Sequence, residues 1–193
     1  FTRVLCVTKD FEGAMQAVEK FEASMQRDSR PTEFQEDFRT LRVFVQLAAG
    51  KLDEAVDWAD HLHQNKDFQE HPEYYELTLA RVRLAQGRCA DVEQLLAGSS
   101  AKSESANLVR RQIEYHLLLA AAQAGQGRAD EALAHIGSGL DLAEPQGYIR
   151  VFLDVGEPVR NLLAAYLRSD SPAQAAHARK VLEAFLAAGD TAD

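Results

Sequence analysis

The sequence has few of the residues that build disulfide frameworks, strands or membrane spans. Its 193 residues include only two cysteines, five prolines and one tryptophan. Alanine and leucine dominate the apolar share and favour helices, whereas the β-branched residues that favour strands are scarce. The two cysteines, Cys6 and Cys89, have no CxxC or Cys/His spacing, which suits a reducing cytosol. The composition therefore predicts an all-α, cytoplasmic protein.

Positive charge and long apolar runs are missing as well. With a formal net charge of −9 and a pI near 5.2, the chain has no concentration of Lys and Arg that could hold phosphates. No apolar run approaches the roughly 20 residues that span a bilayer, and no basic-then-apolar leader opens the chain. We expect contact with neither nucleic acid nor membrane. Because the chain begins with Phe1 and not Met, we also expect it to be part of a longer protein.

The common signatures of catalysis and phosphate binding are absent from the sequence, including GxSxG, HExxH and GxxxxGK followed by Ser or Thr. His61 and His63 are two residues apart on a predicted helix, so they do not share a face for metal binding. Acid pairs such as Asp53-Glu54 fall at predicted helix starts, where the helix dipole explains them. We therefore expect no catalytic residue, no metal and no cofactor. An enzyme would need carboxylates that converge on a cleft.

One turn signature recurs along the chain: Gly, a basic residue, a gap, an acid and then a small apolar residue. The copies begin at Gly50, Gly87 and Gly127 and end at Ala55, Val92 and Ala132. Glycine tolerates the left-handed conformation that closes a helix, and an acid favours the positive start of the next helix. A period of about 40 residues is typical of a two-helix repeat. Each signature therefore predicts one corner between two helices.

These corners predict a single helical-repeat domain over residues 1–193, with about four antiparallel helix pairs in 1–143. The predicted pairs are 1–8 with 11–27, 33–49 with 52–65, 73–86 with 89–97, and 106–125 with 129–143. Shorter helices in 144–188, two of them near 158–168 and 172–188, are expected to cap the exposed apolar end of the array. Residues 189–193 are predicted to be a linker.

Stacked helix pairs form a superhelix whose first helices line an extended inner face, which is a surface for a peptide, a domain or a small molecule. A tetratricopeptide-like register places five residues toward this face: Asp37, Tyr74, Leu77, Arg81 and Glu114. Tyr74 offers an amphipathic ring and Arg81 a planar donor fork, so they are the best suited to recognition. The alternative is inter-repeat packing for Tyr74 and solvation for Arg81.

The repeats depart from the tetratricopeptide pattern at several packing positions of the first helices. Large and small packing residues are replaced there by Arg39, Arg42, His116 and Gln123. We therefore expect tetratricopeptide-like units and not clean copies of the motif.

The segment 142–158, with the sequence LAEPQGYIRVFLDVGEP, resembles the end of the helical sensor region in the large MalT-like regulators of the LuxR type. The resemblance extends from Leu77 to Leu167 and includes repeat-like stretches at 79–88 and 126–133. Val155 stands where the family pattern has an acidic residue. The matching residues of the closing segment are Gly147, Tyr148, Arg150, Phe152, Asp154, Gly156 and Pro158.

The resemblance implies a multidomain bacterial transcription activator with an N-terminal signal-transduction ATPase, a helical superhelix and a C-terminal helix-turn-helix. In such proteins the superhelix receives a small-molecule inducer or a regulatory protein and influences self-association. The rival hypothesis is a free-standing scaffold that binds peptides or proteins and has no link to transcription. The segment 142–158 distinguishes them, because a generic scaffold has no reason to carry it.

The same closing segment also has a purely structural interpretation. Gly147 would end one helix and Gly156 the next, while Tyr148, Val151 and Phe152 would be buried against the last repeat. We favour this interpretation over direct ligand contact by the aromatic side chains.

Overall fold

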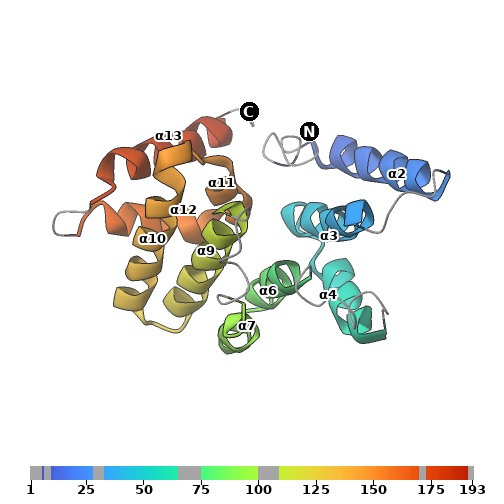
Figure 1. Ribbon diagram of the computed structural model, residues 1–193, viewed down its shortest axis with the longest axis horizontal. Helices are drawn as coiled ribbons and strands as arrows, with labels where there is room; N and C mark the ends of the chain where they lie inside the picture. Colours follow the sequence, from blue (N-terminus) through green and yellow to red (C-terminus); the bar gives the residue numbers. More distant parts are fainter. Residues whose placement is uncertain are drawn as a thin grey trace. The chain divides into compact units, whose positions relative to one another are not determined.

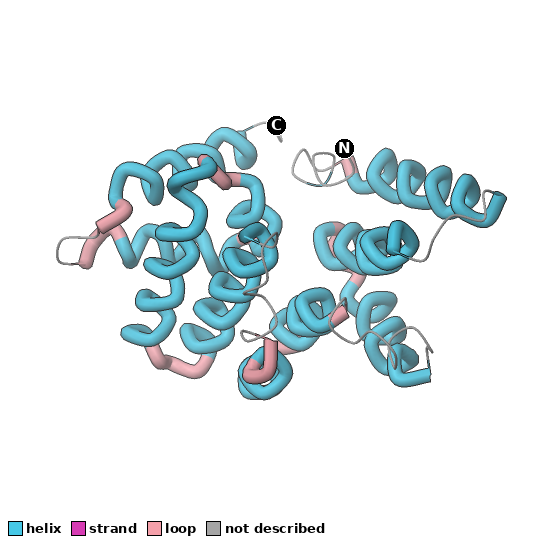
Figure 2. The backbone as a smooth tube through the Cα atoms, viewed as in Figure 1, coloured by secondary structure: helices cyan, strands magenta, loops and turns pink. Residues whose placement is uncertain are grey.

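The computed structural model describes residues 6, 10–27, 33–64, 75–99, 109–169 and 173–190. These residues form helices joined by short turns, and no strand occurs among them (Figures 1 and 2). The all-α prediction is confirmed. None of the helices in these ranges is long and apolar enough to cross a membrane. The chain divides into two compact units, Phe1–Ala85 and Gln86–Asp193, and the prediction of a single domain stays a prediction.

The first unit contains helices from the predicted first, second and third pairs. They are α2 (Phe11–Arg27), α3 (Glu33–Ala48), α4 (Leu52–His61), the 3-10 turn η1 (Leu62–Gln64) and α6 (Glu76–Ala85). Helix α3 contacts α2, α4 and α6 (Figure 1). The core between α2 and α3 contains Ala14, Val18, Phe44 and Val45, together with Cys6. The rest of the predicted helix 1–8 lies outside the described residues.

The second unit has α9 at its centre. Its elements are α7 (Cys89–Leu96), α9 (Val109–Gly125), α10 (Ala129–Ala143), η3 (Glu144–Gln146), α11 (Arg150–Val155), α12 (Glu157–Tyr166) and α13 (Ala175–Asp190). Helix α9 contacts α7, α10, α11 and α12, so four helices of the same unit pack against it. Helix α13 includes residues 189 and 190 of the predicted linker, and residues 191–193 are not described.

The three predicted corners have the backbone that their glycines imply. Gly50, Gly87 and Gly127 have φ values of 73°, 73° and 76°, in the left-handed region. The small residues that end two of the signatures, Ala55 and Ala132, are fully buried. The turn chemistry read from the sequence therefore places the helix ends correctly.

At the last corner, the backbone hydrogen bonds form a Schellman motif, which satisfies the final carbonyl groups of α9. The Arg128 N–H donates to the Gln123 carbonyl at 3.0 Å, and the Gly127 N–H donates to the Ala124 carbonyl at 3.0 Å. The corner at Gly50 repeats this pattern, with the Lys51 N–H donating to the Gln46 carbonyl at 2.9 Å. The motif uses only neighbouring residues, so a short sequence is enough to specify it.

The Gly127→Ala substitution should reduce the free energy of unfolding by about 1–2 kcal/mol, because a residue with a Cβ is strained at positive φ. No atom lies within 4 Å of the added methyl group, so the cost comes from the backbone alone. Urea denaturation of both proteins measures the difference. Gly98 also has open space around it but no positive φ, so Gly98→Ala is the control and should leave stability unchanged or slightly higher. Equal stability of Gly127→Ala and the parent would contradict the prediction.

The closing segment adopts the structure that its glycines and apolar residues predict. Gly147 has φ 67° and ends η3, and Gly156 has φ 89° and separates α11 from α12. Pro158 lies in the first turn of α12, where its missing N–H costs nothing. Phe152 is fully buried and Tyr148 packs against the same core. These positions agree with the structural interpretation, and the preference for packing over ligand contact by the aromatic side chains stays a prediction.

Candidate functional site

The four residues predicted to contact a ligand or partner have different places in the structure. Tyr74 and the side chain of Asp37 lie outside the described part of the chain. Arg81 on α6 and Glu114 on α9 are both buried, with 8% and 4% of their surface exposed. Their role in binding stays a prediction, and the structure shows that neither presents an open surface in this arrangement of the helices.

Arg81 is held against an aromatic ring of the neighbouring helix. Its guanidinium carbon lies 5.5 Å from the ring centroid of Phe44 on α3, within the range of a cation–π contact. Phe44 is itself buried, and sequence reasoning did not single it out. The alternative prediction, in which water solvates Arg81, is therefore wrong, because this side chain is packed against α3.

The first helices of the later repeats are buried on most of their surface. In α6 the buried residues run almost consecutively, at Leu77, Leu79, Ala80, Arg81 and Val82. In α9 they run from residue 117 to residue 123. A helix that is apolar around most of its circumference has neighbours on more than one side. The inner helices therefore expose little side-chain surface among the residues that the structure describes.

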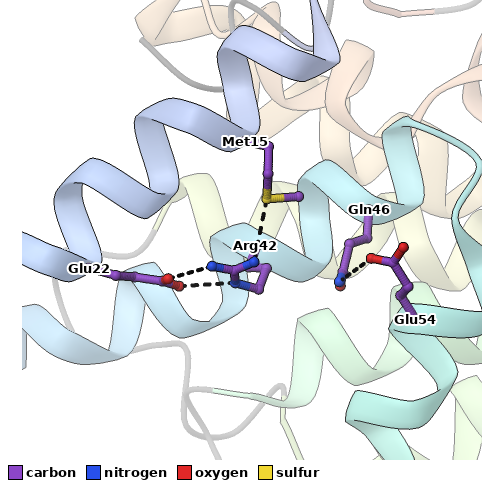
Figure 3. A network of polar contacts seen from close by, with 5 residues as sticks. All are labelled: Met15, Glu22, Arg42, Gln46 and Glu54. Atoms are coloured by element: carbon purple, nitrogen blue, oxygen red, sulfur yellow. Dashed lines mark hydrogen bonds and ion pairs between the residues drawn. The ribbon is translucent and has the colours of Figure 1, made fainter.

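Arg42, one of the departures from the repeat pattern, has an acidic partner on the preceding helix. Its Nη2 and Nε lie 2.5 and 3.2 Å from the two carboxylate oxygens of Glu22 on α2. Its Nη1 lies 3.6 Å from the Met15 sulfur (Figure 3). The bidentate geometry fixes the orientation of both side chains. At this position an ion pair thus takes the place of an apolar contact and stands beside the apolar core between α2 and α3.

A second polar contact joins α3 to α4. The Gln46 amide nitrogen donates to a Glu54 carboxylate oxygen at 2.9 Å (Figure 3). This hydrogen bond, followed by one from Lys51, lowers the pKa of Glu54. The Lys51 ammonium lies 3.2 Å from the same carboxylate, so this corner cation pairs with an acid in the first turn of the following helix.

Gln123, another departure from the pattern, belongs to a cluster around Glu93 on α7. The Glu93 carboxylate forms an ion pair with Arg128 and accepts a hydrogen bond from the Gln126 amide at 3.0 Å. The hydrogen bonds from Arg128, Gln126 and Gln123 lower the pKa of Glu93, with Arg128 contributing most. Glu93 therefore connects α7 to the corner between α9 and α10.

His116, the third departure, faces a histidine on the other helix of its pair. The Nδ1 atoms of His116 on α9 and His135 on α10 are 2.8 Å apart, so one ring donates to the other. Desolvation and the nearby His135 lower the pKa of His116 to about 4. Sequence reasoning did not consider His135. A partial signal was available, because the two residues lie on the two helices that the Gly127 corner joins.

Two acids and two arginines join α9 to α11 within the second unit. The Asp154 carboxylate lies 2.9 Å from Arg150 Nε and 3.8 Å from Arg110 Nη2. Arg110 Nη2 also lies 3.4 Å from the Glu114 carboxylate. Both acids are buried, whereas both arginines are partly exposed. Glu114, predicted to bind a ligand, thus takes part in the attachment of the closing segment.

One comparison with known proteins agrees with this arrangement of helix pairs. The family model for the MalT-like TPR region matches residues 2–169. The chain belongs to the MalT-like TPR region family. No curated protein and no solved structure matches the chain. The match extends the resemblance seen in the sequence, which began at Leu77, over the first helix pairs of this TPR region.

Acidification should destabilise this MalT-like TPR region through His116. The pKa of His116 is about 4 in the folded chain, against an ordinary value of 6.5. Since only the unfolded chain takes up a proton between these values, stability is full above about pH 6.5 and falls as the pH approaches 4. Each pKa unit corresponds to about 1.4 kcal/mol, and partial exposure of the ring reduces the expected loss to about 2 kcal/mol.

Urea denaturation between pH 4 and 7.5 measures this effect, with His116→Asn as the comparison. Asparagine keeps a polar group near the position of Nδ1 but cannot titrate. The difference in stability between the parent and the variant should therefore shrink or reverse at low pH. A constant difference across the pH range would contradict the prediction.

Proposed function

We propose that this MalT-like TPR region is the non-catalytic sensor and interaction module of a multidomain bacterial transcription activator. The match over residues 2–169 is the observation that carries the proposal. The helix pairs and the buried closing segment of the second unit support it. In this proposal the parent chain is a cytoplasmic regulator of the LuxR type, with an ATPase before this region and a helix-turn-helix after it.

The effector is a small-molecule inducer or a regulatory protein, received by the first helices of the repeats. Arg81 and Glu114 are almost completely buried, so an effector that contacts them must bind another arrangement of the helices. An effector shifts the population between two arrangements by the difference in its affinities for them. The consequence is that binding at the inner helices would be coupled to a change in how the repeats pack.

The polar contacts between helices suit such a change. Apolar packing positions are replaced by Arg42, His116 and Gln123, each of which has a polar partner on a neighbouring helix. Water can satisfy polar groups that separate, whereas exposed apolar surface remains unfavourable. Rearrangement at these contacts therefore costs less than opening an apolar interface of the same area. Self-association of the parent chain is a further consequence that we propose for the effector-bound arrangement.

A thermal-shift screen of sugars, amino-acid derivatives and aromatic metabolites tests for a small-molecule effector. A ligand at 100 times its Kd should add about 2.7 kcal/mol to the free energy of unfolding. The Arg81→Lys variant keeps the charge but loses the planar fork. It should reduce the affinity for a ligand that reaches α6. Arg160→Lys changes an exposed arginine on α12 and serves as the control.

The sequence of the parent gene separates this proposal from the scaffold alternative. A phosphate loop upstream and a helix-turn-helix downstream are expected. A parent gene with neither would overturn the regulatory assignment and leave a free-standing scaffold for peptides or proteins.

A further inference from the structure

The pair formed by His116 and His135 brings two imidazole nitrogens together between helices that are fixed to each other. The two Nδ1 atoms are 2.8 Å apart, and the ring centroids are 5.1 Å apart. Both rings are partly exposed, so solvent and solutes can reach them.

We propose that His116 and His135 bind a divalent transition-metal ion of the Zn²⁺ class through their Nδ1 atoms, linking α9 to α10. Imidazole nitrogen is a preferred ligand of Zn²⁺, Cu²⁺ and Ni²⁺, whereas Mg²⁺ and Ca²⁺ prefer oxygen. No group of three or more metal-ligating side chains occurs in the described ranges of the chain. Water therefore completes the coordination, and the site is weaker and more labile than a structural zinc site.

Binding requires a change of tautomer and no net loss of a proton. In the free pair, one ring carries a proton on Nδ1 and donates it to the other. When the metal binds, that proton moves through solvent to Nε2 of the same ring, and both Nδ1 lone pairs face the ion. The two nitrogen–metal bonds replace the N–H···N hydrogen bond and two of the metal's bound waters.

A neighbouring ring orients one member of the pair. Tyr115 packs edge-on against His116, with the ring centroids 5.4 Å apart, and limits the movement of that ring. The site is thus oriented for a metal ion without any contribution from the effector-binding residues.

Isothermal titration of ZnCl₂ into the full chain at pH 7.5 tests the proposal. One saturable site per chain is expected, with an upward shift in the melting temperature and a change in the ¹⁵Nδ1 resonances of two histidines. Titration in buffers of different ionisation enthalpy should show no proton release. MgCl₂ should produce neither heat nor a shift. Absence of saturable Zn²⁺ binding would overturn the proposal.

The asparagine variants identify the ligands. His116→Asn and His135→Asn each keep a polar group near the Nδ1 position but remove one metal ligand, so each should abolish saturable binding. His61→Asn removes an exposed histidine of the first unit and should leave Zn²⁺ binding unchanged. The circular dichroism of each variant confirms that it is folded. Binding that survives in both variants, or that is lost in His61→Asn, would place the metal elsewhere.

Discussion

The Phe152→Ala variant should lose about 3–5 kcal/mol of stability, the largest effect expected from any single change considered for this chain. Phe152 is 0% exposed and lies in the core formed by α9, α10, α11, α12 and α13. Its ring also packs edge-on against His177, with centroids 6.3 Å apart. Truncation removes this buried surface and leaves a cavity that the surrounding helices can fill only in part.

Urea denaturation monitored by circular dichroism measures the loss. Hydrogen exchange should show the fastest new exchange in α11, because a helix of six residues is not stable without its tertiary contacts. Leu186→Ala, at an apolar residue that is 59% exposed, is the control and should change stability by less than about 0.5 kcal/mol. A cost for Phe152→Ala below 1 kcal/mol would show that the segment 142–158 is not anchored by this ring.

The Asp154→Ala substitution should reduce the free energy of unfolding by about 3 kcal/mol, because it removes a buried acid and leaves charged partners beside an apolar core. The Asp154 side chain is 1% exposed and pairs with Arg150 and Arg110. This loss of stability lies at the lower end of the range expected for breaking a buried ion pair, since both arginines are partly exposed and water can solvate them. Asp154→Asn should cost less, because an amide oxygen can still accept from Arg150.

A double-mutant cycle with Arg150→Ala measures how much of this cost belongs to the pair. The Glu157–Arg160 pair on α12 is the matched control, because it is also a local ion pair but its acid is 72% exposed. Glu157→Ala should change the free energy of unfolding by no more than about 1 kcal/mol. Equal costs for Asp154→Ala and Glu157→Ala would show that burial adds nothing to the ion pair of the closing segment.

The candidate site was predictable only in part from the sequence. The departures at Arg42, His116 and Gln123 were visible as breaks in the repeat pattern, but their partners Glu22, His135 and Glu93 were not identified. All three partners lie about 20 to 30 residues away in sequence on other helices, so the pairing depends on how the helices pack. A break in a motif showed where a polar contact would form and not what it would contact.

The sequence alone determined the helix corners and the course of the closing segment. Gly50, Gly87, Gly127, Gly147 and Gly156 all have positive φ, and each ends a helix or turn where the sequence predicts it. The physical reason is that these features are local: a left-handed residue and hydrogen bonds to carbonyls three to five residues earlier close the helix, whatever packs around it.

Only the tertiary structure decided which side chains are accessible. A repeat register places Arg81 and Glu114 on the inner side of their helices, but it does not say what covers that side. Phe44 of α3 packs on Arg81, and Arg110 links Glu114 to Asp154 of α11. Burial is the sum of contacts from several helices, each brought in by a different part of the chain, so no local pattern in the sequence contains it.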